Sequence, residues 1–478
     1  MKKLIVSSVF LTIMSLYSYG QFTLDGELRP RFEYRHGYKN VADSSQNSAA
    51  FVEQRTRLNF GYKTEGYIFK LTLQDVHIWG SQPQLVNTYS KTNTDGSLLS
   101  IHEAWGEALL NDYWSFKFGR QEIALDDHRI FGNVGWASQA RSHDAAILKL
   151  KKDKFQLQIG GAYNQDRAAL ANTVAARGSY KALQYVWLNN KFNENFNASI
   201  LFLNNGKEQL DSTRFANQPV TAIYYDNYSQ TAGTRLVYKK GKFALSGAFY
   251  YQTGVHGDRT KIFSDVDGRY NKEIEAMNYS AEIAYKPTKK FSTTLGYEYM
   301  SGQSQTDTSF SYRTVNHAFT PFYGTNHKFN GFMDYFYVGN HVGSVGLQDI
   351  YLKLKYKHEK FWVGTDVHLF MAAEDVLDGY KISEDINTAI NNGTPITDVD
   401  MLQAMSASLG TEIDLTFGFN LSKGVAFKGG YSVMIDTETL AYLKGVTDYK
   451  GQGRTDQNNG WGWAMIIIKP QFIAAKKK

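Results

Sequence analysis

Arginines that recur at every second position near the start of the chain could bind anions. Arg29 and Arg31 occupy one stretch, and Arg55 and Arg57 occupy the next. A guanidinium stays charged at any relevant pH, and its planar fork binds a carboxylate through two hydrogen bonds. Rings of such side chains select anions in pores. We therefore predict a positively charged constriction lined by Arg29, Arg31, Arg55, Arg57, Lys70, Arg120, Arg129 and Arg141.

Carboxylates are interleaved with the same arginines and leave a second interpretation open. They are Asp25, Glu27, Glu33, Glu53, Glu122, Asp126, Asp127 and Asp144. A wide lumen needs internal ion pairs to hold its shape. The arginines could therefore form a structural network with balanced charge instead of a net-positive constriction.

The signatures of an enzyme are absent from the sequence. There is no Gly-x-Ser-x-Gly elbow, no His-Glu-x-x-His pair and no Gly-rich phosphate loop. His102 and Glu103 are adjacent on an expected strand, so they should face opposite sides and cannot act on one atom. The absence of Cys excludes a disulfide scaffold, a Cys-ligated zinc site and a Cys nucleophile. We expect no catalytic residue, no metal and no cofactor.

The elements that position the arginines are strands with one apolar and one polar face. From Phe22 to Arg35, one set of alternate residues is mostly apolar, and six of the seven residues in the other set are charged. Such strict alternation is typical of a strand between two unlike environments. An Arg or Lys that faces lipid at the bilayer midplane costs about 2–4 kcal/mol. In a membrane barrel, the arginines must therefore point into the lumen.

Eighteen segments show this pattern, and short and long connections alternate between them. A soluble β-sandwich has no reason for such regularity. Eighteen strands in one meander also enclose too much space for side chains to fill, so the apolar face must lie outside. We predict an all-β, transmembrane, up-and-down antiparallel β-barrel of about eighteen strands with short periplasmic turns and long extracellular loops. The segments are 22–35, 52–63, 67–79, 101–110, 113–119, 145–151, 155–163, 182–189, 196–203, 228–238, 243–252, 276–285, 292–301, 344–356, 361–372, 409–420, 425–435 and 460–472.

The first twenty residues resemble an export signal. Lys2 and Lys3 precede an apolar run, and small residues follow at Ser18 and Gly20, which predicts cleavage before Gln21. We therefore expect a signal peptide over 1–20 and one outer-membrane barrel domain over 21–478, in the cell outer membrane of a Gram-negative bacterium. The formal net charge of +6 is too mild to indicate a nucleic-acid partner.

Three further features complete the prediction. The loop 120–144 is rich in glycine, aromatic and charged residues, and we expect it to fold inward and narrow the pore. Gly460 to Phe472 should be the closing strand, paired with Phe22 to Arg35, with Pro470 at its end. Aromatic residues near segment ends suit two interfacial girdles; they are Tyr34, Tyr62, Trp79, Trp114, Trp187, Trp362, Trp461 and Trp463.

Several short stretches in the first third of the chain resemble a known family. They are Gly26 to Tyr34, Gln54 to Leu58, Leu73 to Gly80, Glu103 to Trp105, Gly119 to Glu122 and Asp126 to Gly132, with Trp136, Arg141 and Asp144 beyond them. Together they resemble the alginate export family of outer-membrane porins, most strongly over about 22–151. The resemblance implies a monomeric, passive pore with an electropositive constriction for a polyuronate.

The expected function is passive passage of an anionic solute through an Arg-lined lumen. The expected solute is an acidic poly- or oligosaccharide such as alginate, or another small anionic solute. Besides the solute, the expected partner of the protein is the lipid of the outer membrane. The alternative is an outer-membrane barrel enzyme, or a structural or adhesin-like barrel with a plugged lumen.

Overall fold

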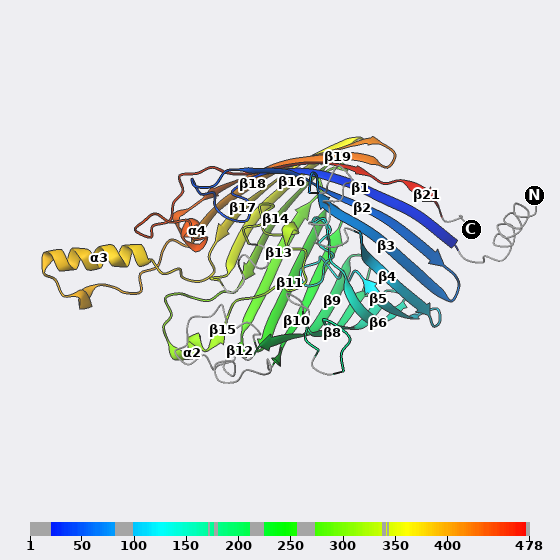
Figure 1. Cartoon of the computed structure of the whole chain (residues 1–478), viewed down its shortest axis with the longest axis horizontal. Helices are drawn as coiled ribbons and strands as arrows, with labels where there is room; N and C mark the ends of the chain where they lie inside the picture. The colour runs from blue at the N-terminus through cyan, green and yellow to red at the C-terminus, as the bar shows by residue number, and fades with distance from the viewer. Residues whose placement is uncertain are drawn as a thin grey trace, which may run out of the picture.

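A computed structural model describes residues 21–81, 99–170, 173–175, 180–210, 224–255, 273–336, 341 and 344–474. The predicted signal peptide, 1–20, lies outside the described residues. No helix in these ranges is long and apolar enough to cross a membrane. The structure consists of one large antiparallel sheet closed into a barrel, with small elements in the connections (Figure 1).

The predicted fold class and the count of eighteen barrel strands are confirmed. Most predicted boundaries lie within three residues of the observed ones, although β9 and β10 extend further at their loop ends. The strands are β1 Gln21–His36, β2 Ala49–Lys63, β3 Tyr67–Ile78, β4 Leu99–Leu109, β5 Trp114–Gln121, β6 His143–Lys152, β7 Phe155–Tyr163, β8 Ala182–Lys191, β9 Phe196–Leu210, β10 Tyr224–Lys240, β11 Phe243–Gly254, β13 Ala276–Tyr285, β14 Phe291–Met300, β16 Leu347–Lys357, β17 Phe361–Met371, β18 Ser408–Ser422, β19 Val425–Asp436 and β20 Asn459–Ile468.

The connections at the two ends of the barrel differ in length. β6 and β7 are joined by only Asp153 and Lys154, whereas β17 and β18 are separated by residues 372–407. Small elements lie in the long connections, among them α3, which lies at the far end of the molecule from β21 in Figure 1. These elements are β12 Glu273–Ile274, α2 Phe310–Arg313, β15 Val315–Asn316, η4 Asn326–Lys328, α3 Gly379–Asn392, η5 Ile396–Asp398 and α4 Glu438–Leu443.

The last strand closes the barrel, as predicted. β20 pairs with both β19 and β1, where Arg35 lies opposite Trp461. The pairing is interrupted at Pro470, which has no N–H to donate. It then continues as β21 Gln471–Ile473, which also pairs with β1. The Pro470 carbonyl accepts a hydrogen bond of 2.9 Å from the Gly26 N–H, so the sheet has no open edge there.

The barrel sheet has an apolar outer face and a polar inner face, which is the reverse of the arrangement in a soluble protein. On β1, Phe22 and Phe32 are 42% and 44% exposed on the outside, whereas Arg29 and Arg31 are 6% and 3% exposed on the inside. Exposed apolar side chains continue around the outer surface, for example Leu295, Leu415 and others of the same parity. An apolar exterior around a polar interior is stable only in lipid. The alternation predicted from the sequence therefore has the predicted orientation.

The interior holds a packed apolar core, and this overturns part of the girdle prediction. Trp187, Trp461 and Trp463 are at most 8% exposed and point inward. Trp362 also lies on the inner parity of β17, the same parity as the buried His368. These four tryptophans are not in an interfacial girdle. Trp461 and Trp463 have an apolar partner inside the barrel because the β5–β6 loop folds inward: the Trp136 ring lies 5.6 Å from that of Trp461 and 4.8 Å from that of Trp463.

Candidate functional site

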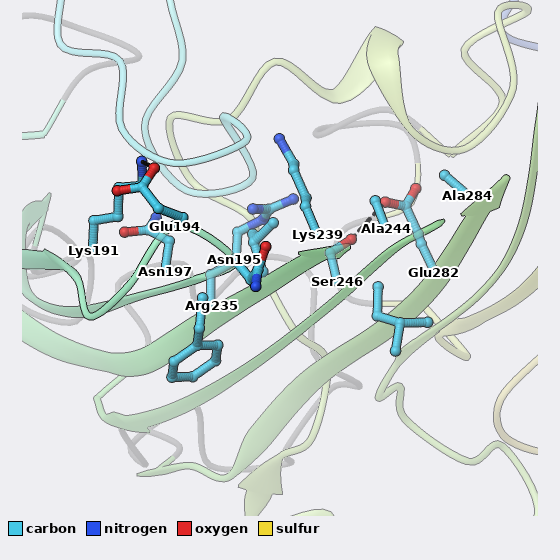
Figure 2. A pocket seen from close by; sticks show the side chains of 13 residues that line it. Lys191, Glu194, Asn195, Asn197, Arg235, Lys239, Ala244, Ser246, Glu282 and Ala284 are labelled. Atoms are coloured by element: carbon cyan, nitrogen blue, oxygen red, sulfur yellow. Dashed lines mark hydrogen bonds and ion pairs between the residues drawn. The ribbon is translucent and has the colours of Figure 1, made fainter. Parts of the chain in front are cut away.

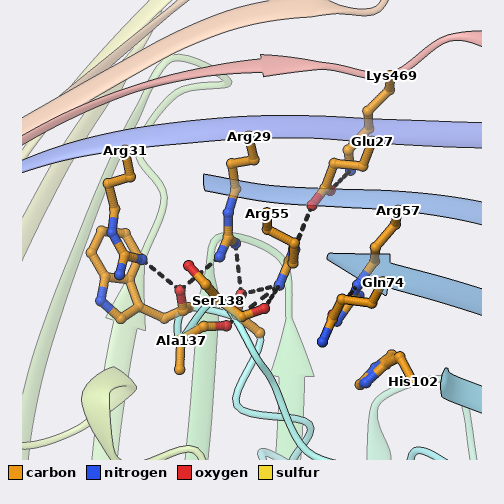
Figure 3. A network of polar contacts seen from close by, with 12 residues as sticks. Glu27, Arg29, Arg31, Arg55, Arg57, Gln74, His102, Ala137, Ser138 and Lys469 are labelled. Carbon is orange, nitrogen blue, oxygen red and sulfur yellow. Dashed lines mark hydrogen bonds and ion pairs between the residues drawn. The ribbon is translucent and has the colours of Figure 1, made fainter. Parts of the chain in front are cut away.

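The loop between β5 and β6 enters the barrel and covers the first arginines. Its main-chain carbonyls accept hydrogen bonds from side chains of the wall. Arg29 donates to the Gly135 oxygen at 2.8 Å and to the Trp136 oxygen at 3.0 Å, and Arg31 donates to the Trp136 oxygen at 2.6 Å. Figure 3 shows these side chains reaching from β1 and β2 toward the loop. The predicted inward course of this loop is therefore observed, and it brings the arginines together beneath it.

Carboxylates pair with some of these arginines and not with others. Arg31 lies 2.7 Å from Glu33 and 2.8 Å from Glu53. Arg55 donates from Nε to Glu27 at 2.8 Å. The network therefore contains structural ion pairs of the kind that the second interpretation requires.

Arg29 and Arg57 differ from the paired arginines. Neither has a carboxylate oxygen within 4 Å of its guanidinium among the described residues. Arg57 donates from Nε to the Gln74 side chain at 2.7 Å, and its buried Nη2 has no hydrogen-bond partner among the residues that the structure describes. The inner wall thus combines ion-paired arginines with two arginines, Arg29 and Arg57, that have no carboxylate within ion-pair distance among the described residues.

A second loop packs against the first and completes a plug. The Thr325 N–H donates to the His128 carbonyl at 2.9 Å, and the Gly132 N–H donates to the Tyr323 carbonyl at 2.9 Å. The His327 ring stacks on Trp136 at 4.6 Å, and its Nδ1 lies 2.9 Å from Asp334. The two loops therefore behave as one packed unit inside the barrel.

The plug is also tied to acidic side chains on a different part of the wall. Glu298 on β14 pairs with Arg129 of the first loop, and both are buried. Glu412 on β18 accepts a hydrogen bond of 2.8 Å from the Met333 N–H of the second loop. Asp349 on β16 lies 2.9 Å from His368 on β17. The loops thus bridge an arginine-rich wall and a carboxylate-rich wall.

The structure contradicts the pore-lining prediction for Arg120 and Arg129. Arg120 has the parity of Phe116 and Phe118, so its side chain lies on the outer face of β5 and pairs with Asp144 at 2.7 Å. Gly119, next to Arg120 in β5, has a positive φ of 111°, but the pairing of β5 with β4 and β6 shows no register shift there. Arg129 forms an ion pair with the buried Glu298, so its charge is neutralised inside the plug. Burial lowers the pKa of Arg129 to about 10, which leaves its guanidinium charged at neutral pH.

The remaining predicted residues occupy two places. Lys70 lies on the inner face of β3 and pairs with Glu103. Arg141 belongs to the first loop, where it donates to the Gly324 carbonyl at 3.4 Å and lies over the Tyr323 ring at 5.9 Å. Lys70 therefore borders the lumen near the short turns, whereas Arg141 connects the two loops.

His102 and Glu103 depart from the expected alternation. Both side chains are buried, at 3% and 6% exposed. The pairing of β3 with β4 shifts by one residue between Thr72 and Leu73, which is a β-bulge. A bulge lets two successive residues face the same side. The prediction that these residues face opposite sides was wrong, although each has its own partner: His102 with Glu122 at 2.8 Å, and Glu103 with Lys70.

Sequence reasoning missed a set of cations on the inner face near the short turns. Lys117 lies 3.9 Å from the centre of the Trp105 ring, and Lys355 lies 4.4 Å from that of Trp362. The same alternation that identified the first arginines could have identified them, because Lys117 stands between the outward Phe116 and Phe118. The set is Lys117, Lys149, Arg235, Lys353, Lys355 and Lys428.

Two pockets open on the inner face at this end. One, of about 500 Å³, lies over β9 to β13 and includes Arg235, Lys239, Ser246 and Glu282 (Figure 2). Arg235 is held there by Asp127 of the first loop at 2.8 Å. The other, of about 320 Å³, lies over β1 to β4 and includes Lys70 and Trp105.

The pair of Arg129 and Glu298 should anchor the plug. Arg129→Met removes one partner and leaves a buried carboxylate uncompensated, at a cost of about 3–5 kcal/mol. We expect the loops to detach while the barrel stays closed, since no β-ladder hydrogen bond is lost. Limited proteolysis should then cleave residues 122–142 at least tenfold faster than in the native chain. The double variant Arg129→Met with Glu298→Leu should be protected again; equal cleavage of all three proteins would contradict the anchoring role.

Comparisons with known proteins agree with the fold. No protein-family model matches the chain, and no curated protein matches it, so the resemblance to the alginate export family is not shown. Solved structures match over nearly the whole length. OccAB4 of Acinetobacter baumannii has a TM-score of 0.57 at 12% identity and covers 95% of this chain and 98% of its own. OccAB1 of the same organism has a TM-score of 0.57 at 10% identity, over 95% and 97%.

A third similar structure contains a bound solute. OpdK of Pseudomonas aeruginosa with vanillate has a TM-score of 0.55 at 8% identity, over 94% of this chain and 99% of its own. Identities of this size establish the fold alone. The fold is that of a closed, 18-stranded antiparallel β-barrel, as in the similar Occ channels.

Proposed function

We propose that the protein is a passive outer-membrane channel for small anionic solutes. The single observation that carries this proposal is that Arg29 and Arg57, on the inner wall below the plug, have no carboxylate within 4 Å among the described residues. A cation without a carboxylate partner in a narrow passage attracts an anion and repels a cation. We also propose that residues 1–20 direct export and are removed, and that one chain, 21–478, forms a complete channel as a monomer.

Further cations extend the positive path toward the short turns. Lys117 and Lys428 lie on the inner face of β5 and β19 and have no ion-pair partner among the described residues. An anion that leaves the arginines would therefore meet a succession of cations, with no nucleotide or proton required to drive it. The concentration gradient supplies the driving force.

The solute class follows from guanidinium chemistry. A planar fork matches a carboxylate, and vanillate, which is present in the similar OpdK structure, is an aromatic carboxylate. An acidic oligosaccharide such as an alginate fragment also carries carboxylates, and we propose it as the more specific candidate for the solute.

Charge selectivity tests the proposal directly. The double variant Arg29→Gln with Arg57→Gln removes two positive charges and should lower the chloride-to-potassium permeability ratio. One unit charge about 8 Å from an ion, in a medium of dielectric about 40, changes the energy of that ion by about 1 kcal/mol, or roughly fivefold in its permeability, so the loss of two charges should lower the ratio by at least this factor. The measurement is the reversal potential of the full protein in a planar bilayer under a KCl gradient.

Arg120→Gln is the matched control, because it removes the same group from the outer face of the wall. It should leave the ratio unchanged. Equal ratios in the native protein and the double variant, with both migrating as folded barrels, would refute the anion-channel proposal.

The packed interior supports a second candidate, a structural barrel with a plugged lumen. Phe131, Met333 and Tyr335 of the two loops are at most 1% exposed and pack against the wall. A folded protein that gives no conductance in the same bilayers would favour this alternative.

A further inference from the structure

We propose that two buried carboxyl groups, those of Glu412 and Asp414, form a proton-dependent latch that holds the second loop of the plug in place. Loss of a proton shared by the pair should release this loop at alkaline pH. The regulatory meaning of the latch rests on the proposed function, because it names what controls the width of the same lumen. The latch itself is a property of the plug, and its test does not depend on conductance.

The two carboxyl groups lie side by side inside the barrel. Glu412 and Asp414 are two residues apart on β18, so both point to the inner face. Their exposed fractions are 0% and 1%, and their side chains lie within hydrogen-bonding reach of each other. Among the described residues, no Lys or Arg forms an ion pair with either of them. Two adjacent carboxyls that are buried without a cation cannot both stay ionised at low cost.

The hydrogen bonds of the pair indicate where a proton is held. Glu412 Oε1 accepts from the Met333 N–H, and Asp414 Oδ1 accepts from the Ser432 hydroxyl. The other two oxygens, Glu412 Oε2 and Asp414 Oδ2, are buried and have no partner among the described residues. An ionised carboxylate only accepts hydrogen bonds, whereas a protonated one also donates. One proton shared by the two carboxyls therefore supplies the missing donor, and the closed plug holds it.

The latch contacts the backbone of the second loop. The Met333 N–H donates to Glu412 at 2.8 Å. Gly331, with a φ of 76°, presents bare backbone to the same carboxyl, and a Cβ added there would overlap Glu412. Met333 and Tyr335, which follow Gly331, are both 0% exposed. Water can therefore reach the pair only when this part of the loop moves away from β18.

Proton linkage gives the direction of the pH effect. With the loop detached, both carboxyls are hydrated and ionised at neutral pH, so the closed state binds one proton more than the open state. A difference of one proton shifts the equilibrium toward the open state by up to about tenfold per pH unit as the pH rises. Acid pH therefore favours the closed state.

The neighbouring titratable groups act in the same direction. His327 lies 2.9 Å from Asp334 in the second loop, and His368, opposite Glu412 on β17, lies 2.9 Å from Asp349. Each His pairs most strongly with its carboxylate when it is protonated, which again favours the closed state at acid pH. The other titratable groups around the pair are Asp366 on β17, Asp436 on β19 and Tyr335 of the loop.

Trypsin cleavage after Lys328, an exposed lysine of the second loop, measures release of that loop in the detergent-solubilised full chain. The cleavage rate of the native chain is divided by that of Glu412→Gln at the same pH, which cancels the pH dependence of the protease. The amide in this variant still accepts from Met333 and donates to Asp414 at every pH. We expect a ratio near one at about pH 5.5 and about tenfold or more at about pH 9. A ratio near one throughout would overturn the latch.

Two further variants test the assignment to this pair. Asp414→Asn gives Glu412 a permanent donor and should also abolish the alkaline rise in cleavage. Glu107→Gln is the matched control, because Glu107 is a buried inward carboxyl on β4 whose partners, Ser115 and Lys149, belong to the wall. It should keep the native rise. A rise that survives in Asp414→Asn, or is lost in Glu107→Gln, would overturn the assignment.

Conductance in planar bilayers tests the regulatory role separately. The native conductance should increase over the pH interval in which cleavage increases, while that of Glu412→Gln should stay constant. A native conductance that stays constant while cleavage rises would overturn the control of the lumen by the latch. The reversal potential still decides the anion-channel proposal independently.

Discussion

Excising residues 134–140 and joining their ends with two glycines should raise the single-channel conductance several-fold. The cut is feasible because the Asn133 carbonyl accepts a hydrogen bond of 2.8 Å from the Arg141 N–H, so the ends of the excised segment already meet. The segment holds the carbonyls that bind Arg29 and Arg31, together with the Trp136 ring that stacks on His327. Its removal therefore empties the lumen beside the arginines and leaves the wall intact.

The same excision should also increase anion preference. Each hydrogen bond from an arginine to a loop carbonyl stabilises the folded loop by about 1.5–3 kcal/mol. After the excision, water and solute anions would take the place of these carbonyls. Conductance and reversal potential in planar bilayers measure both effects. The control excision removes residues 379–402, whose ends also meet, since the Asp378 N–H donates to the Gln403 carbonyl at 2.9 Å. That segment carries α3, which projects from the barrel (Figure 1), so conductance should not change. A native-like conductance after the first excision would show that residues 134–140 do not obstruct the path.

Removing residues 461–478 should abolish folding, the largest effect expected for any change in this protein. The segment includes all but the first two residues of β20, which pairs on one side with β19 and on the other with β1. Its loss exposes two strand edges to lipid, where an unpaired N–H or C=O costs several kcal/mol. It also removes Trp461, which is fully buried and donates to Glu33 at 3.0 Å.

Heat-modifiable migration on gels and protection from protease report the closed barrel. Both should disappear in the protein truncated before residue 461. Truncation before residue 475 should keep both, because the described strand β21 ends at Ile473. A barrel that closes without residues 461–478 would mean that another segment pairs with β1.

The sequence by itself determined the wall of this protein. A strand that separates lipid from water must alternate apolar and polar side chains, because successive side chains point to opposite faces. The alternation from Phe22 to Arg35 therefore predicted both the strand and the inward direction of Arg29 and Arg31. The order of short and long connections predicted the meander, and the last segment predicted the closure with β1. These signals are local or depend only on chain order, which explains why the count of eighteen strands was confirmed.

Local alternation also explains where the sequence-based prediction of the site was wrong. Arg120 shares the parity of the outward Phe116 and Phe118, so strict alternation along β5 already places it on the outer face, and its assignment to the lumen did not apply that alternation. Glu103 and His102 share a face because β4 contains a bulge. One residue of shift reverses every inward and outward assignment that follows it, and no composition or motif announces such a shift.

Only the tertiary structure decided what the inward arginines contact. The partners of Arg29 are carbonyl oxygens more than a hundred residues away, at Gly135 and Trp136, and every residue has a carbonyl, so the sequence carries no mark of them. The tryptophans at positions 461 and 463 have the same chemistry as girdle residues, and they face inward because Trp136 and the loops give them a packed neighbour. Whether a side chain of a strand points inward or outward depends on the alternation of apolar and polar residues along that strand. What fills the lumen depends on which distant loops meet there.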